Sequence, residues 1–213
     1  MTRKHQYQTL LGLLMLCVVS VAQASSQQWT FKVFLHDQEI GQHRFEVFTQ
    51  DTTRYVAVEA SFAVKFLFFT AYDYQHSNYE VWQRQCLQSI QSRTNDNGEL
   101  QFVQGERQGD VLRVSTPEGE DKLPGCIRTF AYWDPAFLNS RFLLNAQTGE
   151  LQAVQIDKLG AKTIEVRGKA VAANQYRIVT DAFSIDLWYS PQREWLALQS
   201  TTRDGAVLRY QLQ

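Results

Sequence analysis

Alternation of apolar and polar residues with a period of two runs through most of the chain. Trp29, Phe31 and Val33 would point to one face of a strand, while the residues between them would point to the other. Similar segments follow at short intervals and are separated by turn-forming pairs such as Asn97-Gly98 and Asp204-Gly205. Because strands joined by such short turns are antiparallel neighbours, the pattern predicts about eleven or twelve strands in one long meander.

A sheet with this many strands does not stay flat. We expect an all-β, mainly antiparallel domain that curls into an open or a closed barrel, with one face toward an enclosed side and one toward water. A β-sandwich is the competing architecture, but hairpin connections along nearly the whole chain argue against the long crossovers of a Greek key.

Two segments interrupt the alternation and predict one or two short helices over the mouth of the barrel. The segment Phe62–Phe69 is uniformly apolar, and Phe62, Phe66 and Phe69 would share one helical face, which favours a short helix or a turn. Asp134 followed by Pro135 is typical of an N-cap and the first residue of a helix, here a single turn.

The N-terminus has the three parts of a secretory signal peptide. Two basic residues open the chain, the run Leu10–Val21 is apolar, and Ala22-Gln23-Ala24 offers small residues for cleavage. The apolar run is short for a membrane span. We therefore predict a signal peptide over residues 1–24, cleavage after Ala24, and one periplasmic domain over residues 25–213, with an uncleaved membrane anchor as the alternative.

Composition narrows the classes of partner. Without the two basic residues of the signal peptide, 19 Lys and Arg face 22 Asp and Glu, a formal net charge of −3. There is no basic run, so binding to nucleic acid or to an anionic membrane surface has little electrostatic support. Aromatic residues make up 13% of the chain and favour strands with large buried area.

Two cysteines, Cys86 and Cys126, remain after cleavage. In an oxidising compartment an even pair predicts a disulfide, with two buried thiols as the alternative. The chain has no Cys-x-x-Cys motif, so we do not expect a redox role.

The densest group of chemically versatile residues lies between Thr70 and Trp82. In strand geometry its alternate residues from Tyr72 onward combine aromatic rings with hydrogen-bonding groups on one face, which suits a binding pocket. A core strand with satisfied polar groups is the alternative. The candidate ligand-binding residues are Phe62, Phe66, Phe69, Tyr72, Tyr74, His76, Glu80 and Trp82.

The sequence gives less support to a metal site or a hydrolytic catalytic site. A zinc site needs three or four converging ligands, and the candidates have no recognised ligand spacing; they are His36, His43, His76 and Glu80. A Ser-His-Asp hydrolase site also has little support. Ser77 and Asp73 would point away from His76 on a strand, and no Gly-x-Ser-x-Gly elbow occurs. We therefore predict no catalytic residue, no metal and no cofactor.

Motifs along nearly the whole mature chain resemble an uncharacterised family of exported bacterial proteins described only as a domain of unknown function. They are Ile40-Gly41-Gln42-His43, Phe62-Ala63-Val64-Lys65, the aromatic and polar run Tyr72–Trp82, Thr94–Gly98, Tyr132-Trp133, Asp186–Tyr189 and Asp204-Gly205. This resemblance implies no activity. The meander with an early short helix is also similar in architecture to the open barrels of periplasmic lipoprotein carriers, which implies a fold rather than a function.

Three functional hypotheses remain. The preferred one is a non-enzymatic periplasmic domain that binds an apolar or amphipathic, lipid-like molecule on the concave face, with Phe62–Phe69 as part of a lid. The second is an envelope structural or interaction protein whose interior is filled by its own side chains. The third is an enzyme that uses the face of Tyr72, His76 and Glu80. We expect no nucleic acid and no stable membrane span after cleavage.

Overall fold

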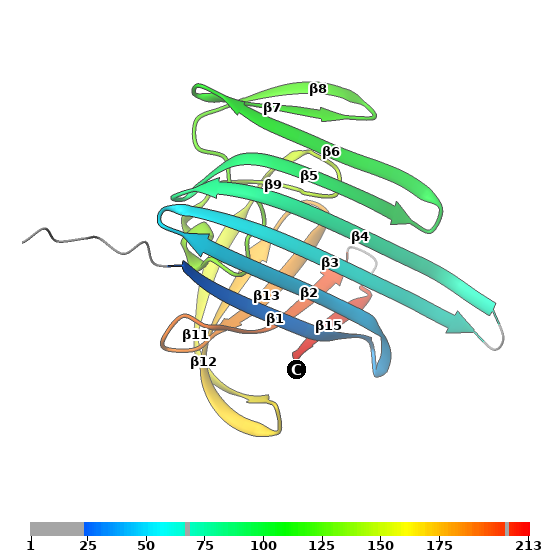
Figure 1. The fold of residues 1–213 in the computed structure, drawn as a ribbon. Helices are drawn as coiled ribbons and strands as arrows, with labels where there is room; N and C mark the ends of the chain where they lie inside the picture. The colour runs from blue at the N-terminus through cyan, green and yellow to red at the C-terminus, as the bar shows by residue number, and fades with distance from the viewer. Residues whose placement is uncertain (1–23, 67–68, 203–204) are drawn as a thin grey trace, which may run out of the picture.

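The computed structural model describes residues 24–66, 69–202 and 205–213, and within these ranges it contains fifteen strands and one short helix (Figure 1). The strands of the N-terminal half are β1 (Ala24–Leu35), β2 (Gln38–Gln50), β3 (Thr53–Phe66), β4 (Phe69–Gln83), β5 (Cys86–Asp96), β6 (Glu99–Gln108), β7 (Val111–Thr116) and β8 (Gly119–Pro124). The rest of the chain forms the 3₁₀ helix η1 (Pro135–Asn139) and the strands β9 (Phe142–Leu144), β10 (Leu151–Ala153), β11 (Gln155–Val166), β12 (Lys169–Val179), β13 (Phe183–Tyr189), β14 (Trp195–Thr202) and β15 (Val207–Leu212).

Thirteen strands form one antiparallel sheet in the order β11-β12-β13-β14-β15-β1-β2-β3-β4-β5-β6-β7-β8. The sheet consists of two meanders, β1–β8 and β11–β15, joined where β15 pairs with β1 and Leu212 lies opposite Phe31. Strands β8 and β11 lie at the two edges, so the sheet is open. The prediction of an all-β antiparallel meander is confirmed. In Figure 1 the strands of the first meander form a broad curved layer, and those of the second lie behind it.

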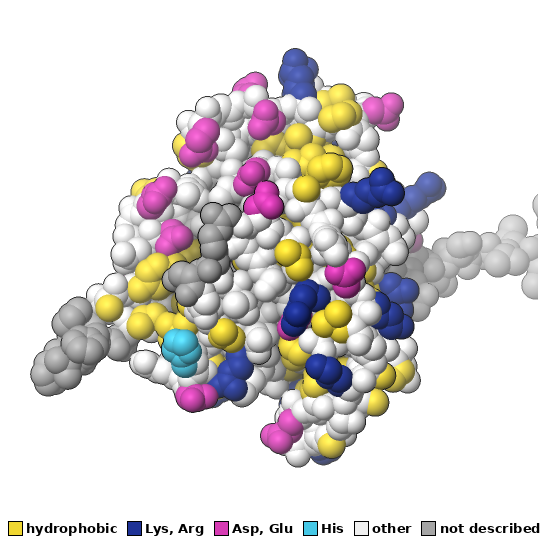
Figure 2. Space-filling model, turned by 180° about the vertical axis from the view of Figure 1, so that it is seen from behind, with side chains coloured by type: hydrophobic (Ala, Val, Ile, Leu, Met, Phe, Trp, Pro, Cys, Tyr) yellow, Lys and Arg dark blue, Asp and Glu magenta, His cyan; other side chains and the backbone are white. Residues whose placement is uncertain are grey.

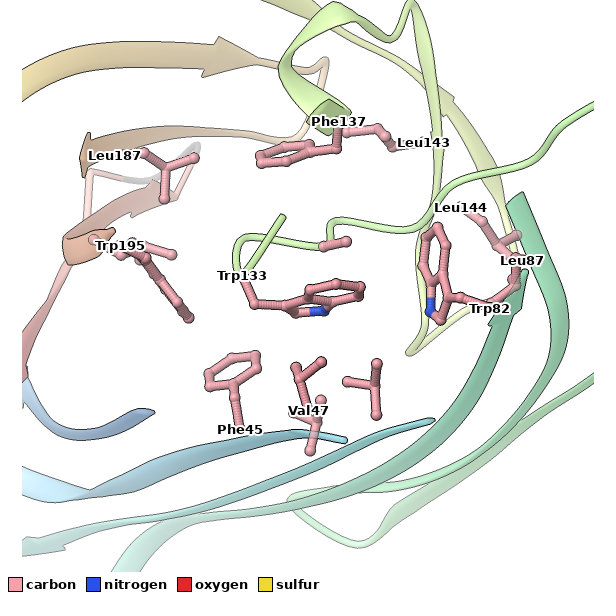
Figure 3. Packing of buried hydrophobic residues seen from close by; sticks show 14 of the residues in the cluster. Phe45, Val47, Trp82, Leu87, Trp133, Phe137, Leu143, Leu144, Leu187 and Trp195 are labelled. Carbon is pink, nitrogen blue, oxygen red and sulfur yellow. The ribbon is translucent and has the colours of Figure 1, made fainter. Parts of the chain in front are cut away.

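The chain passes from edge strand β8 to edge strand β11 through the concave side of the sheet. We call this stretch, residues 125–154, the inner segment; it contains η1 and the small β9–β10 sheet. Its apolar side chains are part of the main core: Trp133 is 8% exposed, Phe137 1% and Leu144 0%. Figure 3 shows Trp133 in the centre of this core next to Phe45 and Val47 of β2, and Leu144 beside Trp82 and Leu87. Much of the concave side is therefore filled by the chain itself.

The period-two pattern sets which side chains enter this core. Trp29, Phe31 and Val33 of β1 are all buried, as their alternation predicts: Trp29 and Phe31 in the main core, and Val33 in a smaller cluster with Ile40 and Phe62. Trp195 contacts both Phe31 and Phe45, with ring centroids 4.4 Å and 4.9 Å apart. Aromatic pairs at this spacing add to the burial of their apolar area. The aromatic residues thus join β1, β2 and β14 across the middle of the sheet.

A disulfide joins Cys86, the first residue of β5, to Cys126 in the inner segment. Beside it, the backbone N–H of Leu87 donates to the carbonyl of Ile127 at 3.0 Å. The predicted bridge is thus present in the structure, and it anchors the start of the inner segment to the sheet.

The helix predicted over Phe62–Phe69 is wrong. Phe62 to Phe66 end strand β3, Phe69 begins β4, and Leu67-Phe68 lie outside the described residues. In the strands, Phe62 lies opposite Tyr74 and Val64 opposite Tyr72. A long antiparallel ladder satisfies the backbone of both strands, and aromatic and β-branched residues fit it well, so it outweighs the local helical pattern.

The second predicted helix is confirmed as the 3₁₀ helix η1. The Asp134 carboxylate accepts a hydrogen bond from the backbone N–H of Ala136 at 3.0 Å, and Pro135 is the first helical residue. The helix does not cover a mouth, however. Phe137 anchors it within the core because the inner segment turns into the concave side.

The predicted signal peptide falls almost wholly on residues 1–23, which lie outside the described part of the chain. Ala24, the residue before the predicted cleavage site, is the first residue of β1 and lies opposite Gln50. Cleavage after Ala24 stays a prediction.

Replacement of Gly41 by Ala should lower the free energy of unfolding by about 3 kcal/mol. Gly41 has φ of +152°, and an added Cβ would lie 1.9 Å from the backbone oxygen of Ser61 on β3. Denaturant unfolding of both proteins measures the loss. Gly98→Ala is the matched control, because Gly98 also has positive φ (+96°) but an added Cβ meets nothing within 4 Å. Equal losses in the two variants would contradict a specific close approach at Gly41.

Candidate functional site

The inner face of β4 carries most of the side chains that the sequence analysis singled out. Asn78, Glu80 and Trp82 are 7%, 2% and 1% exposed, whereas Ser77 and Tyr79, which alternate with Asn78 and Glu80, are exposed on the outer face. The alternation of the strand thus places polar groups within an apolar interior, where each of them needs a hydrogen-bond partner.

A cavity of about 250 Å³ lies between this face and the inner segment. We call it the inner cavity. Its walls come from three parts of the chain: the strands β2–β4, the inner segment and the strands β13–β14. The residues that line it are His43, Phe45, Val58, Tyr74, His76, Asn78, Glu80, Thr129, Phe130, Ala131, Tyr132, Trp133, Asn145, Ala146, Gln147, Phe183, Ile185 and Ser200.

Two histidines face this cavity from neighbouring positions of the sheet. His43 and His76 both lie opposite Ala60, on its two sides. The His43 ring stacks on Phe45 with centroids 4.3 Å apart, and both of its nitrogens are buried without a hydrogen-bond partner among the described residues. Burial, with a smaller contribution from His76, lowers the pKa of His43 from 6.5 to about 3. His43 is therefore neutral at pH 7.

His76 has one hydrogen-bonded nitrogen. Its Nδ1 lies 2.8 Å from the Thr94 hydroxyl oxygen, which fixes the orientation of the ring. Burial lowers the pKa of His76 from 6.5 to about 4, so this imidazole is also neutral at pH 7.

Glu80 is a buried carboxyl group with three hydrogen-bond donors. Asn78 Nδ2 donates at 2.9 Å, Trp82 Nε1 at 2.7 Å and the Thr129 hydroxyl at 3.4 Å. Burial raises the pKa of Glu80 above 4.5, although these three hydrogen bonds act in the opposite direction. The carboxyl group thereby links β4 to the inner segment.

Asn78 leaves a second polar group unsatisfied in the cavity wall. Its Nδ2 donates to Glu80, but its Oδ1 is buried and has no hydrogen-bond partner in the part of the chain that the structure describes. Together with the two nitrogens of His43, the cavity wall thus contains three buried polar atoms that a bound molecule could satisfy.

Tyr74 marks the end of the cavity near the β3–β4 hairpin. Its hydroxyl donates to Gln147 Oε1 of the inner segment at 3.0 Å, and its ring stacks on Phe62 with centroids 5.3 Å apart. Tyr72 instead donates to Asp96 Oδ1 at 2.7 Å and does not line the cavity.

The predicted site residues therefore separate into groups. Tyr74, His76 and Glu80 line the cavity, and Phe62 packs behind Tyr74. Trp82 is a core residue that packs edge-on against Trp133, with ring centroids 5.6 Å apart. The side chains of Phe66 and Phe69 lie outside the described part of the structure. The roles of all eight predicted site residues in ligand binding stay predictions.

Sequence reasoning missed His43 as a cavity residue. The signal was present, because His43 shares its face with Phe45 and Val47 by strict alternation. The contribution of Thr129–Trp133 had no comparable signal, since it depends on the course of the inner segment.

A second, larger depression of about 1330 Å³ lies on the outer face over β2–β7. Side chains such as Gln75, Ser77 and Gln91 line it and are exposed to solvent. The inner cavity is the stronger candidate because the buried Glu80 carboxyl group and the unpartnered nitrogens of His43 line it and do not line the outer depression.

Neither a metal cluster nor a membrane-spanning helix is found in the described ranges. No group of three or more His, Cys, Asp or Glu side chains there could hold a metal ion. No helix among these residues is long and apolar enough to cross a membrane. On the face of the molecule shown in Figure 2, acidic and basic side chains are interspersed.

One solved structure similar to this chain is described as the crystal structure of a beta-barrel-like protein of domain of unknown function DUF1849 from Brucella abortus. The two share 12% sequence identity with a TM-score of 0.65, over 87% of this chain and 94% of that one. At this identity the likeness concerns the fold alone. The comparison with curated proteins finds no match.

The family comparison concerns nearly all of the sheet. The model of a family described as "Domain of unknown function (DUF6134)" matches residues 31–213, from β1 to the C-terminus. The prediction of a family without an assigned activity is thereby confirmed, while the similarity to lipoprotein carriers stays a prediction. The chain belongs to the family described as domain of unknown function DUF6134.

Proposed function

We propose that the protein is an exported, non-enzymatic domain that binds a small amphipathic molecule in the inner cavity. The observation that carries this proposal is the combination of apolar walls with buried polar atoms that have no partner, on His43 and Asn78. Each buried, unsatisfied polar group costs about 1–3 kcal/mol. A ligand with a hydrogen-bonding head would recover part of that free energy, and an apolar body would add hydrophobic burial.

The size of the cavity limits the ligand. About 250 Å³ corresponds to roughly eight water molecules, which is below the usual range for drug-sized ligands. Phe45, Val58 and Ile185 offer apolar contacts for a short chain or a single ring. The proposed ligand is therefore a molecule with about eight carbon atoms in its buried part, rather than a whole lipid.

The filled concave side supports a second candidate function. Because the inner segment packs against the sheet through Trp133, Phe137 and Leu144, much of the interior has no room for cargo. This favours a structural or interaction role in the envelope, in which the inner cavity holds only water. The disulfide is typical of exported proteins and supports either role outside the cytoplasm.

An enzymatic use of the Tyr72, His76 and Glu80 face has less support. The hydroxyl of Tyr72 is bonded to Asp96 outside the cavity, and the oxygens of Glu80 already accept three hydrogen bonds.

Titration with 1-octanol tests ligand binding. In the wild-type protein, nuclear Overhauser contacts should join the octyl chain to the methyl groups of Val58 and Ile185. Val58→Trp should weaken octanol binding at least tenfold, because Val58 lies on the inner face between Phe45 and Asn78 and a larger side chain would fill the cavity.

Ala57→Trp is the matched control, since Ala57 precedes Val58 on β3 and points to the outer face. This variant should bind octanol like the wild type. If wild-type protein shows no contact with octanol at the cavity, the ligand-binding proposal fails and the structural role stands. The contacts in wild-type protein decide this point even if Val58→Trp does not fold.

A further inference from the structure

We infer that the head group bound in the inner cavity is uncharged and both donates and accepts hydrogen bonds, as a hydroxyl group does. This inference rests on the proposed function and names the chemical class of its ligand. The geometry of three side chains, His43, Asn78 and Glu80, carries it.

His43 sets the first requirement. A neutral imidazole has one nitrogen that donates and one that accepts, and in His43 both are buried without a partner. A hydroxyl head group can form a hydrogen bond with either nitrogen, whichever tautomer is present. An ether can only accept a hydrogen bond and an ammonium can only donate one. At a given nitrogen of His43, each of them can therefore bond to only one of the two tautomers.

Asn78 sets the second requirement. Its unpartnered Oδ1 accepts only, so it calls for a donor in the ligand. Val58 separates Asn78 from Phe45 on the sheet, and His43 lies two residues before Phe45 on β2. The two polar side chains thus lie on opposite sides of β3 and line the same cavity. A ligand with a second hydroxyl group would reach both.

The charges around the cavity exclude an ionic head. Among its lining residues, all of which are described, there is no Lys or Arg to pair with a carboxylate. Glu80 is the one acidic side chain in the lining, and both of its oxygens already accept hydrogen bonds, so an ammonium group would have to compete with three donors of the protein. An unpaired charge in such a site costs far more than an unpaired dipole. The lowered pKa values of His43 and His76 agree with a site that disfavours charge.

Four probes of nearly equal size test the inference at pH 7.5: 1-octanol, heptyl methyl ether, octanoate and octylammonium. Calorimetry or NMR titration should show that octanol binds at least tenfold more tightly than either ion, and more tightly than the ether. Octanoate binding should strengthen about tenfold when the pH is lowered from 7.5 to 6.5, because only its neutral acid would bind.

A variant at His43 isolates the head-group contact. His43→Leu should reduce the difference in affinity between octanol and the isomeric ether, because the imidazole is lost while the apolar walls and Asn78 Oδ1 remain. The comparison of the four probes on wild-type protein stands even if this variant does not fold.

The outcomes separate this inference from the proposed function. If octanoate or octylammonium binds as tightly as octanol at the cavity, the head-group inference is wrong while ligand binding holds. If the ether binds as tightly as octanol to the wild type, the requirement for a donor is wrong. If none of the four binds, the proposed function itself fails.

Discussion

Replacement of His43 by Phe should make the protein more stable, and the gain should grow as the pH falls. At pH 7.5 the variant should be about 1–3 kcal/mol more stable, because two buried nitrogens without partners are removed while the stacking on Phe45 is kept. Between pH 7.5 and pH 5 the difference should increase by about 2 kcal/mol.

The sign of this effect follows from the pKa of His43. Burial lowers it from 6.5 in the unfolded chain to about 3 in the folded protein. The stability that the neutral histidine contributes is therefore fully present above pH 6.5. It is lost as the pH falls toward 3, because the unfolded chain takes up a proton that the folded protein does not.

Denaturant unfolding at several pH values between 7.5 and 5 measures the effect. His76 also makes both proteins less stable at low pH, and by a similar amount, because burial lowers its pKa to about 4. Glu80 acts in the opposite direction, since its raised pKa favours the folded state at low pH. Neither residue is changed in the variant, so the difference between the two proteins isolates His43.

His36→Asn is the control for loss of an imidazole. His36 is exposed in the β1–β2 turn with φ of 54°, a conformation that Asn tolerates. Because His43 is unchanged in this variant, its free energy of unfolding should fall at low pH by the same amount as that of wild-type protein. A constant stability difference between His43→Phe and wild type across the pH range would contradict the burial of a neutral His43.

The sequence was sufficient for those parts of the fold that depend on local pattern. Trp29, Phe31 and Val33 are buried because a strand places alternate residues on one face, and that rule needs no knowledge of neighbours. Asp134-Pro135 likewise predicted η1 from capping chemistry alone. In contrast, the apolar segment from Phe62 satisfies a helical pattern equally well, and only pairing with Tyr72 and Tyr74 decides for a strand.

The candidate site was less predictable because it depends on contacts distant in sequence. Thr129 donates to Glu80 from 49 positions away, and Tyr74 bonds to Gln147 from 73 positions away. Both contacts exist because the inner segment returns through the concave side. No periodicity in the sequence specifies that course, nor the pairing of β15 with β1 that joins the two meanders.

Replacement of both Cys86 and Cys126 by Ser should lower the free energy of unfolding by about 4 kcal/mol. The bridge closes a loop with a sequence separation of 40, and in the chain-entropy model a loop of this length restricts the unfolded chain by about that amount. The native structure has a further reason to depend on the bridge, because it holds the start of the inner segment against β5.

Denaturant unfolding with and without a reductant measures the contribution of the bridge. Reduction should destabilise wild-type protein by about the same 4 kcal/mol and leave the double Ser variant unchanged, which controls for effects of the reductant itself. Non-reducing electrophoresis of protein isolated from the cell envelope gives the covalent state directly, since the bridged chain should migrate faster than the reduced one. Equal migration, together with two titratable thiols, would contradict the bridge. In that case Leu87 and Ile127 would have to hold the inner segment against β5 without a covalent link.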